Sequence, residues 1–281
     1  MKYTGLQQMI DILKTITVGC IGTGNMGSAI VAGLVKSVGG QHVVCYDADP
    51  DILEKTCAKY SAPKAGSPDD VCRRCDIVIV AVKPDSAVSV LGALRGCAEG
   101  NVVVSVVAGL SLDSMEEILG VAQKIVRVMP NTPALVGEGM SVLSPNGNMV
   151  ENDTDRVKAV FSVLGKVLVL PEKMMDAVTA VSGSGPAYVY TLIHAMTEGG
   201  VKMGIPCDKA LILATQTVLG AAAMVAESGE DPITLRGRVS SPGGTTIEAV
   251  HVLERSGFSG IVIDAVEAAA EKSQRLGRGN K

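Results

Sequence analysis

From residue 16 to about residue 170, short apolar runs alternate with segments of helical spacing. The apolar runs are rich in β-branched residues, which is typical of strands buried on both faces of a sheet. They cover residues 17–21, 42–47, 76–82, 101–107 and 124–129. Helical spacing lies between them, at residues 28–35, 50–60, 88–94 and 112–119. This alternation predicts a doubly wound α/β domain with a mostly parallel sheet over residues 16–171.

After the last of these runs the pattern changes. Strand-like runs at 139–143 and 166–170 flank a polar helix at 153–164, and we expect them to add strands at an edge of the sheet. Beyond residue 171, helical spacing covers residues 174–181, 186–203, 207–228, 246–255 and 262–276.

One of these helical segments, residues 211–223, is apolar nearly all round, so it must be buried on every side. A small domain can hardly enclose such a helix. We therefore expect residues 172–281 to form a helical domain with a subunit interface, and residues 1–15 to be an N-terminal extension.

The composition excludes several classes of partner. The chain of 281 residues is 47% hydrophobic, but two Phe, five Tyr and no Trp leave few platforms for stacking single-stranded nucleic acid. The net charge of −4 provides no basic field for nucleic acid or a membrane surface. No uninterrupted run of about 18 apolar residues predicts a membrane span, and residues 1–15 do not resemble a signal peptide.

The cysteines indicate reduced thiols. Seven of them, an odd number, are scattered through the chain, which favours a cytoplasmic location. Cys72 and Cys75 form a CxxC pair, but no second pair or nearby His completes a zinc site. We expect no metal and interpret this pair as structural thiols near the end of a helix.

A glycine-rich stretch joins the first predicted strand to the first predicted helix. Gly22 permits a tight turn, Gly24 lets a pyrophosphate approach the backbone, and Gly27 lets the helix pack on the strand. Amides of the first helical turn, at the positive end of the dipole, would face the phosphates. The stretch therefore predicts a dinucleotide site, with contacts from Gly22, Thr23, Gly24, Asn25, Met26 and Gly27.

The second apolar run ends in Asp47, about 20 residues after Gly27, where a ribose-binding carboxylate belongs. A carboxylate at this place repels a 2′-phosphate and binds a 2′-hydroxyl. No basic residue follows until Lys55. These residues favour NADH over NADPH.

Ligands of open α/β sheets lie outside the carboxyl ends of the strands. The further cofactor candidates at these ends are Ala81, Val82, Lys83, Pro84, Val107, Ala108, Gly109 and Asn131. Lys83 could meet the ribose or phosphates, or be a solvated lysine at a strand end. Asn131, between two prolines, offers an amide near the nicotinamide or is a simple turn residue.

A second stretch of interest, Ser-Ser-Pro-Gly-Gly-Thr-Thr at residues 240–246, leads directly into a helix. One interpretation is an elaborate N-cap, since Ser and Thr favour that position. The other is a cradle in which amides and hydroxyls bind a carboxylate. The Ser-Gly-Ser-Gly stretch at 182–185 could form a second wall. The substrate-binding candidates in the turn are Ser240, Ser241, Gly243, Gly244, Thr245 and Thr246.

Strong acid–base candidates are sparse. The three histidines, His42, His194 and His251, fall at a strand start and within helices, where structural or surface roles are commoner. A cofactor site without a His or Lys relay fits a reduction in which the substrate arrives already protonated. The protein would then mainly position it for hydride transfer.

Six stretches stand in the order seen in pyrroline-5-carboxylate reductases, and the chain resembles this family from about residue 16 to residue 276. They are residues 22–27, 81–84, 127–134, 182–188, 199–204 and 240–246. The resemblance implies a Rossmann domain followed by a helical dimerisation domain, in a homodimer or a larger homo-oligomer. It also implies reduction of the cyclic imine 1-pyrroline-5-carboxylate to L-proline, the last step of proline biosynthesis.

The same resemblance implies roles for single residues. Thr246 hydrogen-bonds the ring nitrogen of the substrate, residues 241–246 hold its carboxylate, and Glu172 touches the proline ligand. Residues 81–83 and 107–109 match cofactor contacts. Family members often carry Asn where this chain has Ser67 and Pro68, so that cofactor contact is not carried over. The family commonly uses NADPH, so NADPH and NADH both stay open.

Two other functions are compatible with a dinucleotide site. A 3-hydroxyacid dehydrogenase of related architecture needs a base, usually a Lys on the helix after a glycine-rich turn. Residues 187–192 contain no Lys, and Lys202 stands almost a whole helix further on. A dinucleotide-sensing regulatory protein would bind cofactor without turnover and would leave residues 240–246 unused.

Overall fold

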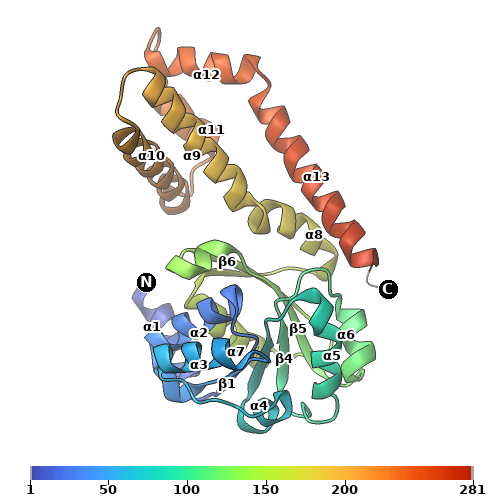
Figure 1. Cartoon of the computed structure of the whole chain (residues 1–281). Helices are drawn as coiled ribbons and strands as arrows, with labels where there is room; N and C mark the ends of the chain where they lie inside the picture. Colours follow the sequence, from blue (N-terminus) through green and yellow to red (C-terminus); the bar gives the residue numbers. More distant parts are fainter. Residues whose placement is uncertain (1, 280–281) are drawn as a thin grey trace. The chain divides into compact units, whose positions relative to one another are not determined.

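The computed structural model describes the backbone of residues 2–279 and the side chains of residues 7–277. It consists of two compact units (Figure 1). The first contains the residues up to Gly183 together with those from Ala269 onward, and the second is Ser184–Ala268.

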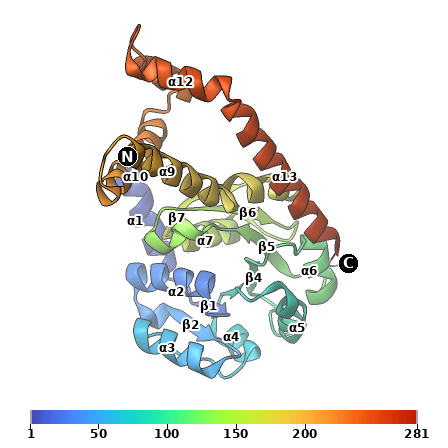
Figure 2. The same cartoon turned by 45° about the horizontal axis from the view of Figure 1, so that its top comes forward.

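The first unit is built on one sheet of seven strands in the order β2-β1-β3-β4-β5-β6-β7 (Figures 1 and 2). Neighbouring strands are parallel except β5 and β6, which are antiparallel. The strands are β1 Val18–Ile21, β2 Val43–Tyr46, β3 Ile77–Val80, β4 Val102–Ser105, β5 Lys124–Met129, β6 Gly139–Pro145 and β7 Gly165–Val169. The predicted doubly wound, mostly parallel sheet is confirmed.

Helices cover both faces of this sheet. Successive strand residues point to opposite faces, and the buried side chains accordingly form two clusters. The first cluster includes residues of α1, α2, α3 and α7, and the second includes residues of α4, α5 and α6. The helices are α1 Lys2–Leu13, α2 Asn25–Val38, α3 Pro50–Tyr60, α4 Pro68–Arg74, α5 Pro84–Leu94, α6 Leu112–Leu119 and α7 Glu151–Ser162.

Short helical segments complete this unit. The 3₁₀ turns are Gly40–His42, Thr132–Val136 and Glu172–Met174, and Met175–Val178 (α8) continues into a π-helix at Thr179–Gly183. The N-terminal extension is largely a helix, α1, which contacts α7 and buries Leu13 to 1% exposure in the first cluster. Leu13 therefore belongs to the core of the unit, and Met9 and Ile12 pack against it.

The order of the strands fixes where a ligand can bind. The chain passes from β1 to β2 on one side and then returns to β3 on the other side of β1, which makes a topological switch point. Ile21, Tyr46 and Val80 are register partners, so β1, β2 and β3 end together. The glycine-rich turn, Asp47 and Ala81 consequently lie together at the carboxyl ends of these three strands.

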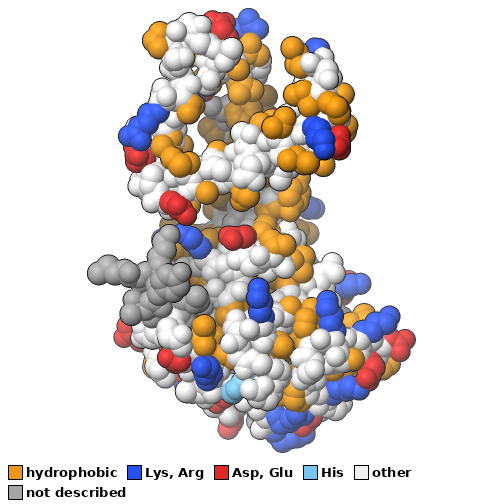
Figure 3. All heavy atoms as spheres, turned by 90° about the vertical axis from the view of Figure 1, so that its left-hand side faces the viewer, with side chains coloured by type: hydrophobic (Ala, Val, Ile, Leu, Met, Phe, Trp, Pro, Cys, Tyr) orange, Lys and Arg blue, Asp and Glu red, His pale blue; other side chains and the backbone are white. Residues whose placement is uncertain are grey.

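The second unit is helical. It contains α9 Gly185–Lys202, α10 Cys207–Ser228, α11 Pro232–Val239, α12 Thr245–Arg255 and the first turns of α13, Phe258–Gly279. Within residues 184–268, all of which are described, Thr197, Ala210 and Ala214 are the buried ones. Its hydrophobic side chains instead lie along open helix surfaces, as in the space-filling view (Figure 3).

Candidate active site

The three glycines of the turn between β1 and α2 have different surroundings. Gly22 has a φ of +91°, and a Cβ on it would lie 2.6 Å from the carbonyl oxygen of Ala81. A Cβ on Gly27 would lie 1.9 Å from the carbonyl oxygen of Gly22. Around Gly24 no other described residue comes within 4 Å of a Cβ. The fold thus requires glycine at positions 22 and 27, whereas the open space around Gly24 leaves room for a ligand.

The start of α2 likewise leaves room for a ligand. Its N-cap is Gly24, and no side chain caps the helix. Ser28 is the first residue of α2 whose amide bonds back to the turn, to the carbonyl oxygen of Gly24 at 2.8 Å. The first helical turn, which includes Asn25, Met26 and Gly27, therefore offers amides and a positive dipole end to an anion.

Asp47 reaches back to this turn. Its Oδ2 accepts hydrogen bonds from the amide of Thr23 at 2.6 Å and from the Thr23 hydroxyl at 3.1 Å. Its Oδ1 accepts from the amide of Asp49 at 3.0 Å. The carboxylate therefore joins the end of β2 to the glycine-rich turn. Its predicted contact with a cofactor ribose stays a prediction.

The end of β3 lies directly against the turn. The amide of Ala81 donates to the carbonyl of Ile21 at 2.8 Å, and a Cβ on Gly22 would also meet the side chain of Val82 at 2.9 Å. Lys83 is the N-cap of α5, and its side chain is exposed to solvent. Ala81 and Val82 therefore lie beside the glycine-rich turn, and the cofactor contacts of residues 81–83 stay a prediction.

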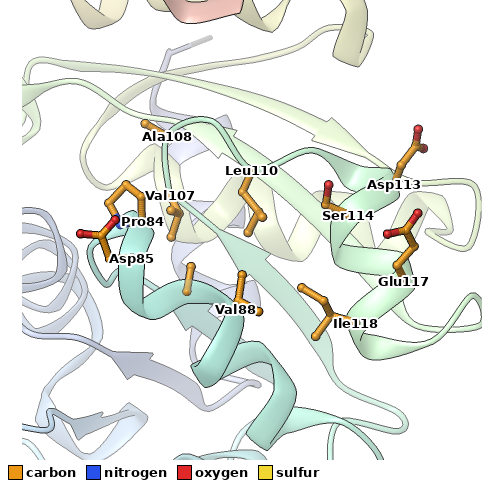
Figure 4. Close-up of a pocket in the computed structure, with 11 residues that line it drawn as sticks. Pro84, Asp85, Val88, Val107, Ala108, Leu110, Asp113, Ser114, Glu117 and Ile118 are labelled. Atoms are coloured by element: carbon orange, nitrogen blue, oxygen red, sulfur yellow. The ribbon is translucent and has the colours of Figure 1, made fainter. Parts of the chain in front are cut away.

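A cavity of about 620 Å³ lies beside the end of β4, between α5 and α6 (Figure 4). Three of the predicted cofactor residues, Pro84, Val107 and Ala108, line this cavity. Three carboxylates also line it, those of Asp85, Asp113 and Glu117. Since these acids would repel phosphate, we expect the phosphates of a dinucleotide at the glycine-rich turn and not in this cavity.

The amide of Asn131 is used within the first unit. Its Nδ2 donates to the carbonyl oxygen of Ser182 at 3.0 Å, and its Oδ1 accepts from the amide of Met140 at 2.8 Å. Asn131 thereby ties the end of β5 to β6 and to the π-helix. This supports the structural interpretation, while its contact with nicotinamide stays a prediction.

Glu172 has two partners, both in the same unit. Its Oε1 accepts a hydrogen bond from the amide of Leu112 at 2.7 Å and from Nη1 of Arg127 at 3.0 Å. Arg127 was not predicted to have a role of its own, because it stands alone among apolar residues of β5. The signal that could have found it is a charged residue in the middle of a buried strand, because buried charged side chains are almost always paired with a partner.

The hydroxyl-rich turn at 240–246 lies in the second unit. The amide of Gly244 donates to the carbonyl of Ser241 at 3.0 Å, and Gly243 has a φ of +67°. A Cβ on Gly244 would lie 2.3 Å from Oγ of Ser241, so a larger residue there would require this hydroxyl to move. Ser240 donates its hydroxyl to the carbonyl of Arg236 at 2.8 Å.

This turn leaves the start of α12 without a side-chain cap, because its N-cap residue is Gly244. Thr245 and Thr246 are the first two residues of the helix. The absence of a capping side chain disfavours the interpretation as an elaborate N-cap. The backbone amides of the first turn are left without a side-chain partner, and their binding of a carboxylate stays a prediction.

Both units match known proteins. A family model for pyrroline-5-carboxylate reductase dimerisation matches residues 172–276, and one for NADP oxidoreductase, coenzyme F420-dependent, matches residues 17–109. The pyrroline-5-carboxylate reductase of Escherichia coli is 42% identical over 265 residues, which cover 93% of this chain and 98% of that protein. That of Glycine max is 40% identical over 275 residues, 94% of this chain and 97% of that protein.

The chain belongs to the pyrroline-5-carboxylate reductase family. Solved structures agree with this membership. A Plasmodium falciparum pyrroline carboxylate reductase with NADP bound has a TM-score of 0.84 and 36% identity, and covers 94% of this chain and 99% of its own. A pyrroline-5-carboxylate reductase of Coxiella burnetii has a TM-score of 0.89 and 31% identity, and covers 93% and 98%.

Membership of the pyrroline-5-carboxylate reductase family confirms the resemblance found in the sequence and the use of a nicotinamide dinucleotide. The Plasmodium relative was solved with NADP, and the matching oxidoreductase model is named for NADP. The preference for NADH that Asp47 suggests therefore stays a prediction.

The histidines and the buried cysteines have structural or surface positions. His42 approaches the carbonyl of Ile16, His194 pairs with Glu198 on an open helix surface, and His251 is exposed. Burial raises the pKa of the thiols of Cys20 and Cys75 to about 12. Among the described residues no group of three or more His, Cys, Asp or Glu side chains is placed to hold a metal ion.

Proposed function

We propose that this chain reduces the cyclic imine 1-pyrroline-5-carboxylate to L-proline with hydride from NADPH or NADH. The observation that carries the proposal is the similarity to curated reductases of this name, which runs through both units at about 40% identity. This reaction is the last step of proline biosynthesis.

The first unit binds the dinucleotide in this proposal. The open start of α2 and the bare Gly24 receive the pyrophosphate, and Asp47 orders the turn through Thr23. Residues 81–84 and 107–109, which follow the carboxyl ends of β3 and β4, contact the rest of the cofactor. When bound, the reduced nicotinamide supplies the hydride.

The second unit binds the substrate in this proposal. Amides at the start of α12, with hydroxyls of residues 240–246, hold the carboxylate, and the hydroxyl of Thr246 bonds the ring nitrogen. The iminium form already carries its proton on nitrogen. Hydride addition to the imine carbon then gives the neutral secondary amine, which takes up a proton from solvent. No side chain has to act as a base, which is consistent with the positions of the three histidines.

The same proposal covers assembly. The dimerisation model supports a homo-oligomer, and we infer that helices of residues 184–268 form a homodimer interface. Among the described residues α10, Cys207–Ser228, is the one helix long and apolar enough to cross a membrane. It lies within the range of the dimerisation model, so contact with a second copy accounts for its apolar surface. We further propose a cytoplasmic location, on the basis of the reduced thiols.

The domain boundaries stay a proposal: residues 1–15 as extension, 16–171 as dinucleotide-binding domain and 172–281 as dimerisation and substrate-binding domain. The dimerisation model begins at residue 172, which supports the second boundary. The compact units divide instead after Gly183.

A spectrophotometric assay with the imine acid, run in parallel with NADPH and NADH, tests the function. We expect oxidation of at least one cofactor that depends on the imine, with proline as product. Cofactor binding without turnover would favour a sensing protein. Oxidation of a 3-hydroxy acid that Lys202→Ala abolishes would favour a dehydrogenase.

A further inference from the structure

Three segments that are far apart in the sequence meet at one carboxylate oxygen. Oε1 of Glu172 lies 2.7 Å from the amide nitrogen of Leu112 and 3.0 Å from Nη1 of Arg127. The side chain of Arg127 is 13% exposed and that of Glu172 is 27% exposed. This pair is less exposed than the ion pairs of the surface helices, so water screens its interaction less.

These contacts hold the first turn of α6. Leu112 is the first residue of the helix, and its amide has no partner inside the helix. The N-cap Ser111 receives the amide of Ser114 at 3.2 Å, and Glu172 receives that of Leu112. A carboxylate at this end also interacts favourably with the helix dipole.

The loop before α6 is thereby held at both ends. At its start, the amide of Val107 donates to Oγ of Ser105 at 3.2 Å, and Ser105 is the last residue of β4. At its end lies the contact of Leu112 with Glu172. Arg127 pairs in register with Ser105, so the partner of Glu172 is anchored to the neighbouring strand. Between the two ends lie residues 107–109, the predicted cofactor contacts.

We infer that Glu172, together with Arg127, is a positioning residue for the cofactor: the pair fixes the start of α6 and so the conformation of residues 107–109. This inference rests on the proposed function for the identity of the cofactor. It differs from the direct contact with the proline ligand that the family resemblance implies. A positioning role acts on dinucleotide affinity, whereas a contact with the imine acts on the KM for the imine.

The test is a titration of purified protein with NADPH in the absence of imine, followed by steady-state kinetics with the imine at saturating NADPH. Glu172→Ala should raise the Kd for NADPH about ten-fold, since it releases both donors. Glu172→Gln keeps an oxygen for Leu112 and loses the charge opposite Arg127, so it should raise the Kd only about two- to five-fold. In both variants the KM for the imine should stay within about two-fold of the wild type.

Two further variants complete the design. Arg127→Met should raise the Kd for NADPH in the same direction, and combining it with Glu172→Ala should add little, because the two side chains act as one unit. Glu54→Ala removes a different Glu from an exposed ion pair with Lys64, and should leave the Kd unchanged.

A raised KM for the imine with an unchanged Kd for NADPH would overturn the inference and assign Glu172 to the substrate. An equal rise in the Kd for NADPH and in the KM for the imine, together with a lowered Tm, would also overturn the inference if Glu172→Gln showed the same changes. Such a result would show that Glu172 has a general role in folding. If the wild type bound NADPH but did not reduce the imine, the proposed function would fail while the titration still decided the role of Glu172.

Discussion

The two compact units of this protein use similar apolar side chains in opposite ways. In the first unit Ile77, Ile79 and Val80 of β3 are 0% exposed, because helices cover both faces of the sheet. In the second, Leu211 and Ile212 on α10 are 49% and 61% exposed. A sheet with two covered faces encloses its own core, whereas these helices leave their apolar sides uncovered. Hydrophobic composition therefore indicates that a surface will be buried, but not within which chain.

The largest effect should come from a charge on the uncovered side of α10. Leu219, which is 59% exposed, lies on this helix. If it is buried between two copies, Leu219→Glu should weaken their association more than about 100-fold, since an unpaired carboxylate would be desolvated. Light scattering coupled to gel filtration measures the change from oligomer to monomer.

Val121→Glu is the matched control for this change. Val121 is 79% exposed and belongs to the first unit, so its replacement should leave the oligomer intact. An unchanged oligomer for Leu219→Glu would show that α10 lies outside the interface, and the second unit would then need another explanation for its open surface.

The next effect separates two glycines of one turn in the first unit. Gly27→Ala places a methyl group 1.9 Å from a backbone oxygen, so it should lower the free energy of unfolding by about 3 kcal/mol or more. Gly24→Ala meets no described atom within 4 Å, so stability should hold while the Kd for NADPH rises about ten-fold or more. Thermal unfolding and NADPH titration of both variants test this contrast, and equal behaviour of the two would contradict it.

A smaller effect should distinguish the reactants held by the two units. Thr246→Ala should lower kcat/KM for the imine about ten- to a hundred-fold, the scale of one hydrogen bond of ~1.4–2.7 kcal/mol in the transition state. The affinity for NADPH should not change. Thr246→Ser keeps a hydroxyl and should recover most of the rate. Imine kinetics unaffected by the Ala variant would remove Thr246 from the mechanism.

The smallest expected effect concerns the choice of cofactor. Asp47→Ser should raise the ratio of NADPH to NADH preference about three- to ten-fold, because it removes a charge that opposes a 2′-phosphate. Asp47→Asn keeps an oxygen for the amide of Thr23, so it separates the charge from the support of the turn. Parallel assays with both cofactors measure the ratio. A flat ratio in both variants would show that Asp47 serves the turn and not the ribose.

Local patterns predicted most of the elements, and some of their ends. The bounds expected for α3, α6, β5 and α10 agree with the structure. The short helix α11 was missed and α4 was predicted only by its end, at Cys72 and Cys75, because both helices are brief and carry few apolar positions. Both nevertheless have a local signal, a capping side chain followed by proline, at Ser67 and at Asp231.

The sequence by itself determined the glycine-rich turn, the alternation of strands and helices and the apolar character of the helix at residues 211–223, because each depends on residues within a few positions of one another. The expectation that this helix is buried on every side is wrong within this chain, since Leu211 and Ile212 are exposed. Only the tertiary structure decided that β6 runs antiparallel to β5, that the extension α1 packs on α7, and that Glu172 meets Leu112 and Arg127. Those partners stand 60 and 45 positions away in the chain. Periodicity reports on local backbone conformation and on which side is apolar, whereas a contact between distant groups depends on the path of the whole chain between them.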